Sequence, residues 1–488
     1  MTIGPAGRLA RLVLVAAIGV GAPLVAVAPA QALPGIAREL PPVITGPIPR
    51  EGPVAPLVAT KQTAVCATEI ATRGDFVSPP AGLVSLDIAK AWEFSKGAGQ
   101  KIAVIDTGVF RHPRLSVIPG GDYVSTGDGT RDCDGHGTIV AGIAAGKQSS
   151  GDGFAGVAPD AQVIAIRQTS ESYAPADARE AGSDTPINAT GYGNVTTLAR
   201  AVIRAVNLGA DVINISETAC FPVNVPMRDQ SLGAAVKYAF SRNVVVVAAA
   251  GNLSTQDQNC TTQNPGANGA RLANPWASVL TQSSPAYFSP YVVSVASVDP
   301  DGRPSNFSLA GPWVTVAAPG TDQVSLNIST NPPVIDAIQL QGKSQPINGT
   351  SYAAPYVAGL AALIKARFPQ LTAAQVIDRI TRTAHHPSDG RDNAVGYGLI
   401  DPVTALTTTT PDTTVAGADV ADPRTGDTRN IYAAEKITPP AAAPAPDHTP
   451  RTIAIGVSLL ALALAVASWA LMRNRNGDRR RLREGTDY

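Results

Sequence analysis

The chain has 488 residues, enough for one large domain or for two to three domains of average size. Its 38 lysines and arginines balance its 38 aspartates and glutamates, so the formal net charge is zero and nothing in the charge favours binding to nucleic acid. The 45 glycines and 41 prolines predict many turns and at least one segment without regular structure.

The first 32 residues have the pattern of a signal peptide. Arg8 and Arg11 precede an apolar run, and this run ends at the tripeptide Ala-Gln-Ala, residues 30–32, which is typical of a signal peptidase site. We therefore expect cleavage after Ala32, and an uncleaved membrane anchor is the alternative. Residues 33–80 are rich in proline and lack a regular apolar period, so we interpret them as an N-terminal extension.

Residues 81–405 have the pattern of a globular α/β domain. Short apolar runs that are typical of buried strands alternate with stretches that are typical of helices, which predicts a parallel sheet covered by helices on both faces. The expected strands lie in KIAVIDTGV, AQVIAIR, DVINIS and NVVVVAAAG, the expected helices in VTTLARAVIRAVNLGA and SLGAAVKYAFSR, and the expected surface loops at about 168–194, 253–285 and 321–347.

Asp106 stands near the end of the first expected strand, in KIAVIDTGV. The carboxyl end of a buried strand is where α/β sheets hold their sites, although an aspartate before Thr-Gly also forms an ordinary turn. The tripeptide Asp-Thr-Gly also suggests an aspartic protease, whose mechanism needs two carboxylates that share a proton. The sequence contains no second tripeptide of this kind, so that class would require a dimer and is disfavoured.

His136 lies in DCDGHGTIVAGIAAG, before a run of small residues that predicts a helix from about Thr138. Gly135 and Gly137 let the backbone turn tightly and leave the ring unobstructed. The other four histidines of the chain lack this setting. His136 is therefore a candidate base, and a histidine in an ordinary glycine-rich turn is the alternative.

Asn252 and Ser351 complete the set of candidates. Asn252 follows a strongly apolar strand in NVVVVAAAGN, where its amide could donate to a developing oxyanion or simply form a turn. Ser351, in NGTSYAAPY, comes just before an expected helix, and we expect Pro355 in the first turn of that helix. The free N–H groups of a helix start favour negative charge, but the same geometry suits a plain helix cap.

A nucleophile elbow of the α/β-hydrolase type is disfavoured at Ser351. That class needs a glycine where the chain has Ala353, and it needs a strand directly before the serine. The sequence has neither feature.

The C-terminal part of the chain has the pattern of a tether. Residues 406–451 are polar and rich in proline, which predicts a linker. Residues 452–472 hold 21 residues without a charge, and a bilayer span needs about 20. The basic tail 473–488 indicates the cytoplasmic side, so the domain would lie outside the membrane, with a buried core helix as the alternative to the span.

The chain has four cysteines, Cys66, Cys133, Cys220 and Cys260, and all lie in the part that we expect outside the membrane. An even count in an oxidising compartment favours two disulfides. Three pairings are possible, of which we favour Cys66–Cys133 with Cys220–Cys260. A zinc site is the alternative, but no close spacing of cysteine and histidine supports it.

The four candidates follow one another as Asp, His, Asn, Ser, and their flanks resemble those of the subtilisin-like serine proteases. The resemblance rests on IDTGV, DGHGTIVAGIAAG, AAAGN and NGTSYAAPYVAGLAAL, with support from residues 294–320, and it covers about 85–402. The layout of signal peptide, protease domain, proline-rich linker and C-terminal span resembles the mycosins. These are membrane-anchored proteases associated with type VII secretion systems.

The resemblance implies a subtilisin-like fold and a role for each candidate. Ser351 would attack the scissile carbonyl, His136 would carry the proton, and Asp106 would orient the imidazole. Asn252 would stabilise the oxyanion, and the substrate would lie extended against a strand edge near Ser216. Protein substrates and components of a type VII secretion membrane complex are the implied partners, and a structural role in that complex is a second hypothesis.

Three features depart from the family pattern. Glu217, Thr218 and Ala219 follow Ser216 where many subtilases have glycines, so we expect a restricted substrate pocket.

The segment after the signal peptide is too short for the usual folded propeptide. No carboxylate-rich loop resembles a calcium cage, so we expect no metal or cofactor. A Cys66–Cys133 bond would instead hold the extension beside the active site.

Overall fold

The computed structural model describes residues 42–67, 69–72, 76–177, 191–254, 260–340, 343–409, 463–464 and 466–469. Met1–Asp412 belong to one compact unit and Thr413–Tyr488 to a second. The predicted signal peptide and basic tail lie outside the described residues, as do most of the linker and most of the predicted span. Of the helices in the described part of the chain, none combines the length and the apolar composition that a bilayer crossing requires.

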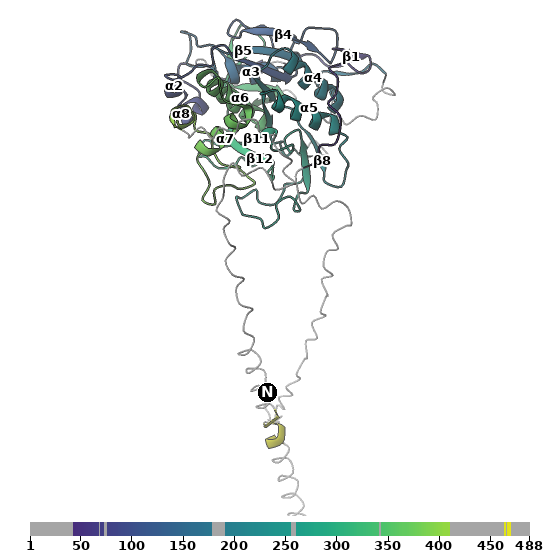
Figure 1. The fold of residues 1–488 in the computed structure, drawn as a ribbon, viewed down its shortest axis with the longest axis vertical. Helices are drawn as coiled ribbons and strands as arrows, with labels where there is room; N and C mark the ends of the chain where they lie inside the picture. Colours follow the sequence, from purple (N-terminus) through teal and green to yellow (C-terminus); the bar gives the residue numbers. More distant parts are fainter. Residues whose placement is uncertain are drawn as a thin grey trace, which may run out of the picture. The chain divides into compact units, whose positions relative to one another are not determined.

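A sheet of seven parallel strands forms the centre of the first unit (Figure 1), in the order β12-β11-β9-β7-β3-β5-β4. The predicted parallel sheet is confirmed, and the four apolar runs that were expected to be strands all belong to it. The strands are β3 (Lys101–Asp106), β4 (Val117–Asp122), β5 (Gln162–Arg167), β7 (Val212–Ile215), β9 (Val245–Ala249), β11 (Val292–Val298) and β12 (Val314–Pro319).

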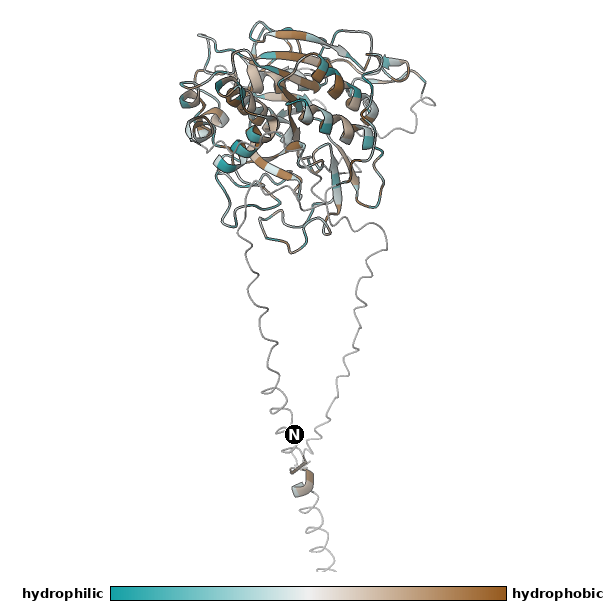
Figure 2. Ribbon diagram, in the orientation of Figure 1, coloured by the Kyte–Doolittle hydropathy of each residue, from teal (hydrophilic) through white to brown (hydrophobic). Residues whose placement is uncertain are grey.

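Helices cover both faces of this sheet because successive residues of a strand point to opposite sides. In β3, Ile102 and Val104 join the core under α3 and α6, whereas Ala103 and Ile105 join the core under α4 and α5. Figure 2 shows the apolar colour concentrated on strands inside the unit, with polar colour on parts of the surrounding helices. The covering helices are α3 (His136–Ala145), α6 (Thr350–Arg367), α4 (Val195–Asn207) and α5 (Gln230–Ser241).

Several helices begin at side chains that cap free backbone N–H groups. The side chain of Asn194 accepts from the N–H of Thr197 at 2.9 Å at the start of α4. Thr372 and Gln375 form a capping box at the start of α7. Asp401 accepts from the N–H of Thr404 before α8. The remaining helices are α1 (Ala81–Ser85), α2 (Ile88–Ala91), α7 (Ala373–Thr383) and α8 (Pro402–Thr407).

The N-terminal extension adds strands to the edges of the domain. Its β1 (Thr60–Gln62) pairs antiparallel with β6 (Tyr173–Pro175), and its β2 (Glu69–Ile70) pairs with β15 (Ala337–Leu340). The predicted loops at about 168–194, 253–285 and 321–347 are therefore wrong in part. Strands β6 and β10 form on distant partners, whereas segment 321–347 forms the local pairs β13–β14 and β15–β16, with β15 also paired to β2. The other short strands are β8 (Ala219–Pro222), β10 (Thr281–Ser284), β13 (Ser325–Leu326), β14 (Val334–Ile335) and β16 (Lys343–Pro346).

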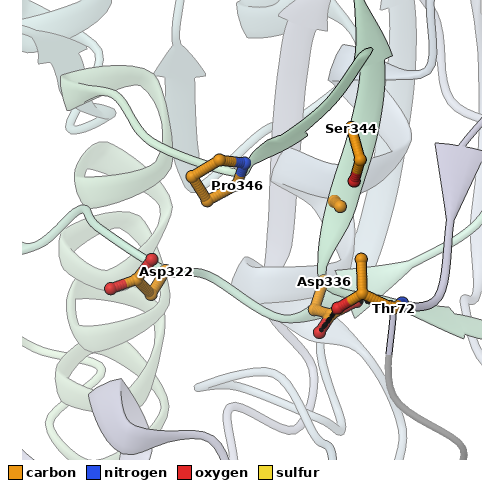
Figure 3. A pocket seen from close by; sticks show the side chains of 6 residues that line it. Thr72, Asp322, Asp336, Ser344 and Pro346 are labelled. Atoms are coloured by element: carbon orange, nitrogen blue, oxygen red, sulfur yellow. Dashed lines mark hydrogen bonds between the residues drawn. The ribbon is translucent and has the colours of Figure 1, made fainter.

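A pocket of about 400 Å³ lies where the extension meets the hairpin of β15 and β16 (Figure 3). The Asp336 carboxylate accepts from the backbone N–H and the hydroxyl of Thr72, each at 2.7 Å. Asp322 lines the other side of the pocket. Because both carboxylate oxygens of Asp336 already accept hydrogen bonds from Thr72, we interpret this pocket as a structural contact that holds the extension on the domain.

Candidate active site

Asp106 is the last residue of β3, and it is fully buried. Its Oδ1 accepts from the N–H of Thr107 at 2.7 Å and lies 2.7 Å from Nδ1 of His136. A carboxylate at this distance holds the proton of the imidazole on Nδ1, which leaves Nε2 as the nitrogen that can accept a proton. The sequence prediction that Asp106 and His136 come together is confirmed.

His136 is the first residue of α3, and the two glycines beside it have different functions. Gly135 has φ of 79°, in the left-handed region that favours glycine. At Gly137 the conformation is ordinary, but a Cβ there would lie 2.0 Å from the carbonyl oxygen of Gly108. One glycine makes the turn, and the other lets the start of α3 approach the end of β3 closely enough for the Asp106–His136 hydrogen bond.

Asp132, which the sequence analysis did not select, organises the loop before His136. Its Oδ1 accepts from the hydroxyl of Thr107 at 2.9 Å and from the N–H of Gly135 at 2.8 Å. Its Oδ2 accepts from the N–H and the hydroxyl of Thr138, at 2.8 and 2.6 Å. An aspartate just ahead of an expected helix start is a capping signal, and this signal could have identified it.

Ser351 lies in the first turn of α6, which begins at Thr350, and it is buried. Pro355 is therefore inside the helix, and its expected place in the first turn is wrong. A proline at this position removes the N–H that would bond to the carbonyl four residues earlier, that of Ser351. The hydroxyl of Ser216 donates to this carbonyl at 2.7 Å instead, which makes an early turn of α6 compatible with proline.

Asn252 is tied to the start of α6 through its amide oxygen. Its Oδ1 accepts from the N–H of Thr350 at 2.9 Å and from the hydroxyl of Thr350 at 3.0 Å. These two donors fix which end of the amide is oxygen and which is nitrogen. The NH₂ group therefore remains as the end that can donate beside Ser351.

The structure brings all four candidates into one site, but it lacks the hydrogen bond between Ser351 and His136 among the described residues. The ring of His136 lies 5.2 Å from the ring of Tyr352, centroid to centroid, and Tyr352 directly follows Ser351. The hydroxyl of Ser351, however, donates to the carbonyl of Ser216 at 2.9 Å, and no hydrogen bond joins it to His136 among the described residues. The link between Asp106 and His136 is complete, whereas the link from His136 to Ser351 is not made.

A second carboxylate lies beside His136. The Oε1 of Glu217 is 3.7 Å from Nδ1 of His136. Burial alone lowers the pKa of His136, but the charge and hydrogen bond of Asp106, together with the charge of Glu217, raise it to about 10. Burial raises the pKa of Glu217, and the nearby charge of Asp106 raises it further, to about 8, although His136 acts in the opposite direction.

Asp106, His136 and Glu217 also form a donor set in which the ligand atoms lie within 4.8 Å of one another. The Asp106 hydrogen bond needs a proton on Nδ1 of His136, and a protonated nitrogen has no lone pair for a metal. This arrangement fits proton transfer better than it fits a resident cation.

Comparison with known proteins places the chain in a family. The subtilase family model matches residues 97–398. The chain is 43% identical to Mycosin-1 of Mycolicibacterium smegmatis over 439 residues, which cover 88% of this chain and 93% of that protein. The crystal structure of MycP1 from Mycobacterium smegmatis matches with a TM-score of 0.70 and 45% identity, over 76% of this chain and 96% of that one.

This chain is a subtilase of the mycosin group. A chain in the structure of an intact ESX-5 inner membrane complex also matches, with a TM-score of 0.68 and 37% identity, over 89% of this chain and 100% of its own length. As a subtilase, the protein is a serine endopeptidase, which agrees with a site built from a carboxylate, an imidazole and a buried serine.

Two disulfides reinforce this subtilase around the site. Cys66 pairs with Cys133, and Cys220 pairs with Cys260, so the pairing favoured from the sequence is confirmed. The first bond joins the extension to the loop three residues before His136. The backbone N–H of Ala67 also donates to the carbonyl of Cys133 at 2.7 Å, which fastens the extension at the same place.

Proposed function

We propose that this subtilase cleaves a narrow set of secreted or envelope proteins as a membrane-anchored member of a type VII secretion machinery. The likeness to a chain of the ESX-5 inner membrane complex supports this assignment. The sequence pattern supports export through residues 1–32, a membrane span at 452–472 and a cytoplasmic tail at 473–488. The protease domain then lies on the outer side of the membrane, beyond the linker 406–451.

In this proposal Ser351, His136 and Asp106 are the catalytic residues. The Ser351 oxygen bonds to the scissile carbonyl carbon while its proton moves to Nε2 of His136. The C–N bond then breaks, and His136 gives this proton to the leaving amine. Water then adds to the acyl carbon and gives a proton to His136, which passes it to the Ser351 oxygen as the ester bond breaks and the acid product leaves. The observation that carries the proposal is the 2.7 Å contact of Asp106 with Nδ1, because it orients the imidazole for this work.

Two donors stabilise the negative charge on the substrate oxygen. One is the NH₂ group of Asn252, whose orientation is set by the bonds of its oxygen to Thr350. The other is the backbone N–H of Ser351, which is among the N–H groups of a helix start that have no acceptor inside the helix. The substrate backbone lies extended beside Ser216, next to the end of β7.

We further propose that the extension, residues 33–80, stays attached as a structural part of the enzyme and does not act as a removable inhibitor. Its strands β1 and β2 pair with the domain, and Cys66 bonds to Cys133 beside the active site. These contacts resist removal of the segment, since a disulfide of this kind contributes about 2–4 kcal/mol.

The test of the protease assignment is peptide release from candidate secreted proteins by the purified protein, followed by mass spectrometry. We expect new peptide ends with the wild type and none with Ser351→Ala. Identical peptides from both proteins would mean that a contaminant or another site cuts the substrate.

A structural role in the secretion complex is the second candidate function. It is favoured by the occurrence of a similar chain within an assembled inner membrane complex. The two functions can be distinguished by expressing the wild type or the Ser351→Ala variant in a strain that lacks this protein and measuring secretion. Secretion that is restored by Ser351→Ala supports the structural role, and secretion restored only by the wild type supports proteolysis as the required activity.

A further inference from the structure

One loop contacts both the nucleophile and the base of the site. The residues between β7 and β8 include Ser216 and Glu217. The carbonyl of Ser216 accepts from the hydroxyl of Ser351 at 2.9 Å, and the hydroxyl of Ser216 donates to the carbonyl of Ser351 at 2.7 Å. Asn214 supports the pair, because its Nδ2 donates to the Ser216 hydroxyl at 2.9 Å.

The next residue, Glu217, reaches the imidazole. Its Oε1 lies 3.7 Å from the same Nδ1 of His136 that Asp106 contacts at 2.7 Å. The side chain of Glu217 is only 12% exposed, so its charge is poorly screened by water. The imidazole thus lies between two carboxylates from different elements, although orientation of a catalytic histidine needs only one.

We propose that Glu217 is a positioning residue that keeps this subtilase in a resting state. When it is ionised, its carboxylate stabilises the protonated imidazole of His136, while Ser216 holds the hydroxyl of Ser351 away from that ring. Catalysis begins when the loop releases both groups.

Both contacts oppose the first chemical step. A protonated imidazole cannot accept the proton of Ser351. The Ser351 hydroxyl, which donates to Ser216, directs its proton away from His136. The raised pKa of His136, to which the charge of Glu217 contributes, agrees with a ring that is protonated at rest.

Besides the phenol of Tyr352, whose ring lies 5.2 Å from that of His136, the other titratable groups that act on this site are carboxylates. Asp132 lies on the loop before α3, and its charge also raises the pKa of His136. Asp134, from the same loop, and Glu171, which follows β5, interact with Glu217 and raise its pKa. Glu217 differs from these three because its carboxylate lies within ion-pair distance of the imidazole, at 3.7 Å. Asp106 also lies within this distance, at 2.7 Å.

A substrate can release this arrangement. This step rests on the proposed function, in which an extended peptide lies beside Ser216. A substrate N–H that donates to the carbonyl of Ser216 takes the acceptor that Ser351 uses at rest, and the freed hydroxyl can then turn toward His136. Because Ser216 and Glu217 lie on the same loop, substrate binding at Ser216 and activation are linked.

The experiment compares wild type with Glu217→Gln from pH 5 to pH 10. The first readout is the rate at which a fluorophosphonate labels the enzyme, and its acid limb reports the pKa of the base in the free enzyme. An opposite charge within 4–6 Å raises the pKa of a base by about 1–3 units, so the limb should move at least about one unit lower. The faster labelling is expected above about pH 8, where Glu217 is ionised in the wild type. Glu93→Gln, an identical change at an exposed residue, should leave the profile unchanged.

The second readout is an NMR titration of His136 in the Ser351→Ala background, which needs no activity. There, Glu217→Gln should lower the pKa of the imidazole by a similar amount, and Glu217→Ala provides a second variant if Gln does not fold. An unchanged titration, or slower labelling at every pH without a shift, would overturn the inference. Absence of labelling in all proteins together with a shifted titration would count against the proposed function and not against the role of Glu217.

Discussion

The two halves of the active site are built from different physical interactions. The base half, Asp106 with His136, is held by buried charge, and a further buried carboxylate, Asp132, fixes its loop. The nucleophile half, Ser351 with Asn252, is held by neutral hydrogen bonds at the start of α6. A change of pH therefore alters the charges that hold the base half, whereas the nucleophile half depends on the positions of neutral donors and acceptors.

This contrast also explains which link of the triad is already formed. Charge and burial favour the Asp106–His136 contact over a wide pH range, because a charge-assisted hydrogen bond is stronger than a neutral one. The hydroxyl of Ser351 instead donates to a neutral group, the carbonyl of Ser216. The nucleophile is therefore the member that a substrate can reposition at small cost.

The largest effect is expected when the charge of the base half is removed. Asp106→Asn should lower kcat by about 10⁴-fold, because the amide no longer selects the imidazole tautomer that can accept from Ser351. Steady-state hydrolysis of a cleaved peptide measures this. Asp301→Asn, an exposed aspartate of a turn, is the control and should leave kcat unchanged. A loss below tenfold would mean that charge is not what holds the base half.

A smaller effect is expected in the nucleophile half. Asn252→Ala should lower kcat by about 10²–10³-fold, with little change in KM, because the amide donates mainly in the transition state.

Asn252→Asp separates the two ends of this amide. The carboxylate keeps the acceptor for Thr350 but has no NH₂ group, so this variant should be at least as slow as Asn252→Ala. Activity near the wild-type level in Asn252→Asp would show that only the structural bond to Thr350 matters.

The smallest effect is expected on stability, in the loop that supports His136. Asp132→Asn should lower the free energy of unfolding by about 1–3 kcal/mol, because an amide cannot accept all the hydrogen bonds that the carboxylate accepts. Denaturant unfolding at pH 4, 5.5 and 7 measures this.

The pH dependence of this difference has a definite sign. Burial raises the pKa of Asp132 to about 6 from 3.8, so the folded wild type binds a proton that the unfolded chain has lost. The resulting contribution is fully present below pH 3.8 and is lost as the pH rises through about 6. The asparagine variant lacks this titration, so the gap between the two proteins should be wider at pH 4 than at pH 7. A constant gap would mean that Asp132 ionises normally.

Local sequence was enough to predict the parts of the molecule that depend on near neighbours. Long apolar runs predicted the strand that ends at Asp106 and the strand that precedes Asn252, since an apolar run of this length is typical of a strand in a buried sheet. The glycines beside His136 predicted a tight turn, which Gly135 makes at positive φ.

The remaining features depend on partners far away in the chain. Strands β13 to β16 have two to four residues each, and β15 forms against β2 of the extension, so the segment 321–347 carried no clear strand signal. Glu217 was recognised only as a replacement for glycine, because its approach to His136 depends on how β3 and β7 pair. Pro355 was misplaced because the carbonyl that it leaves without a helical donor, that of Ser351, accepts from Ser216, which lies 135 residues before Ser351.

The most direct test is to locate the residue that a fluorophosphonate modifies in the intact protein, by tryptic mass spectrometry at pH 8. We expect a single adduct on Ser351, which is absent in Ser351→Ala and strongly reduced in His136→Ala although both variants remain folded. An adduct on another serine, or equal labelling of Ser351 without His136, would contradict a site in which these two residues act together.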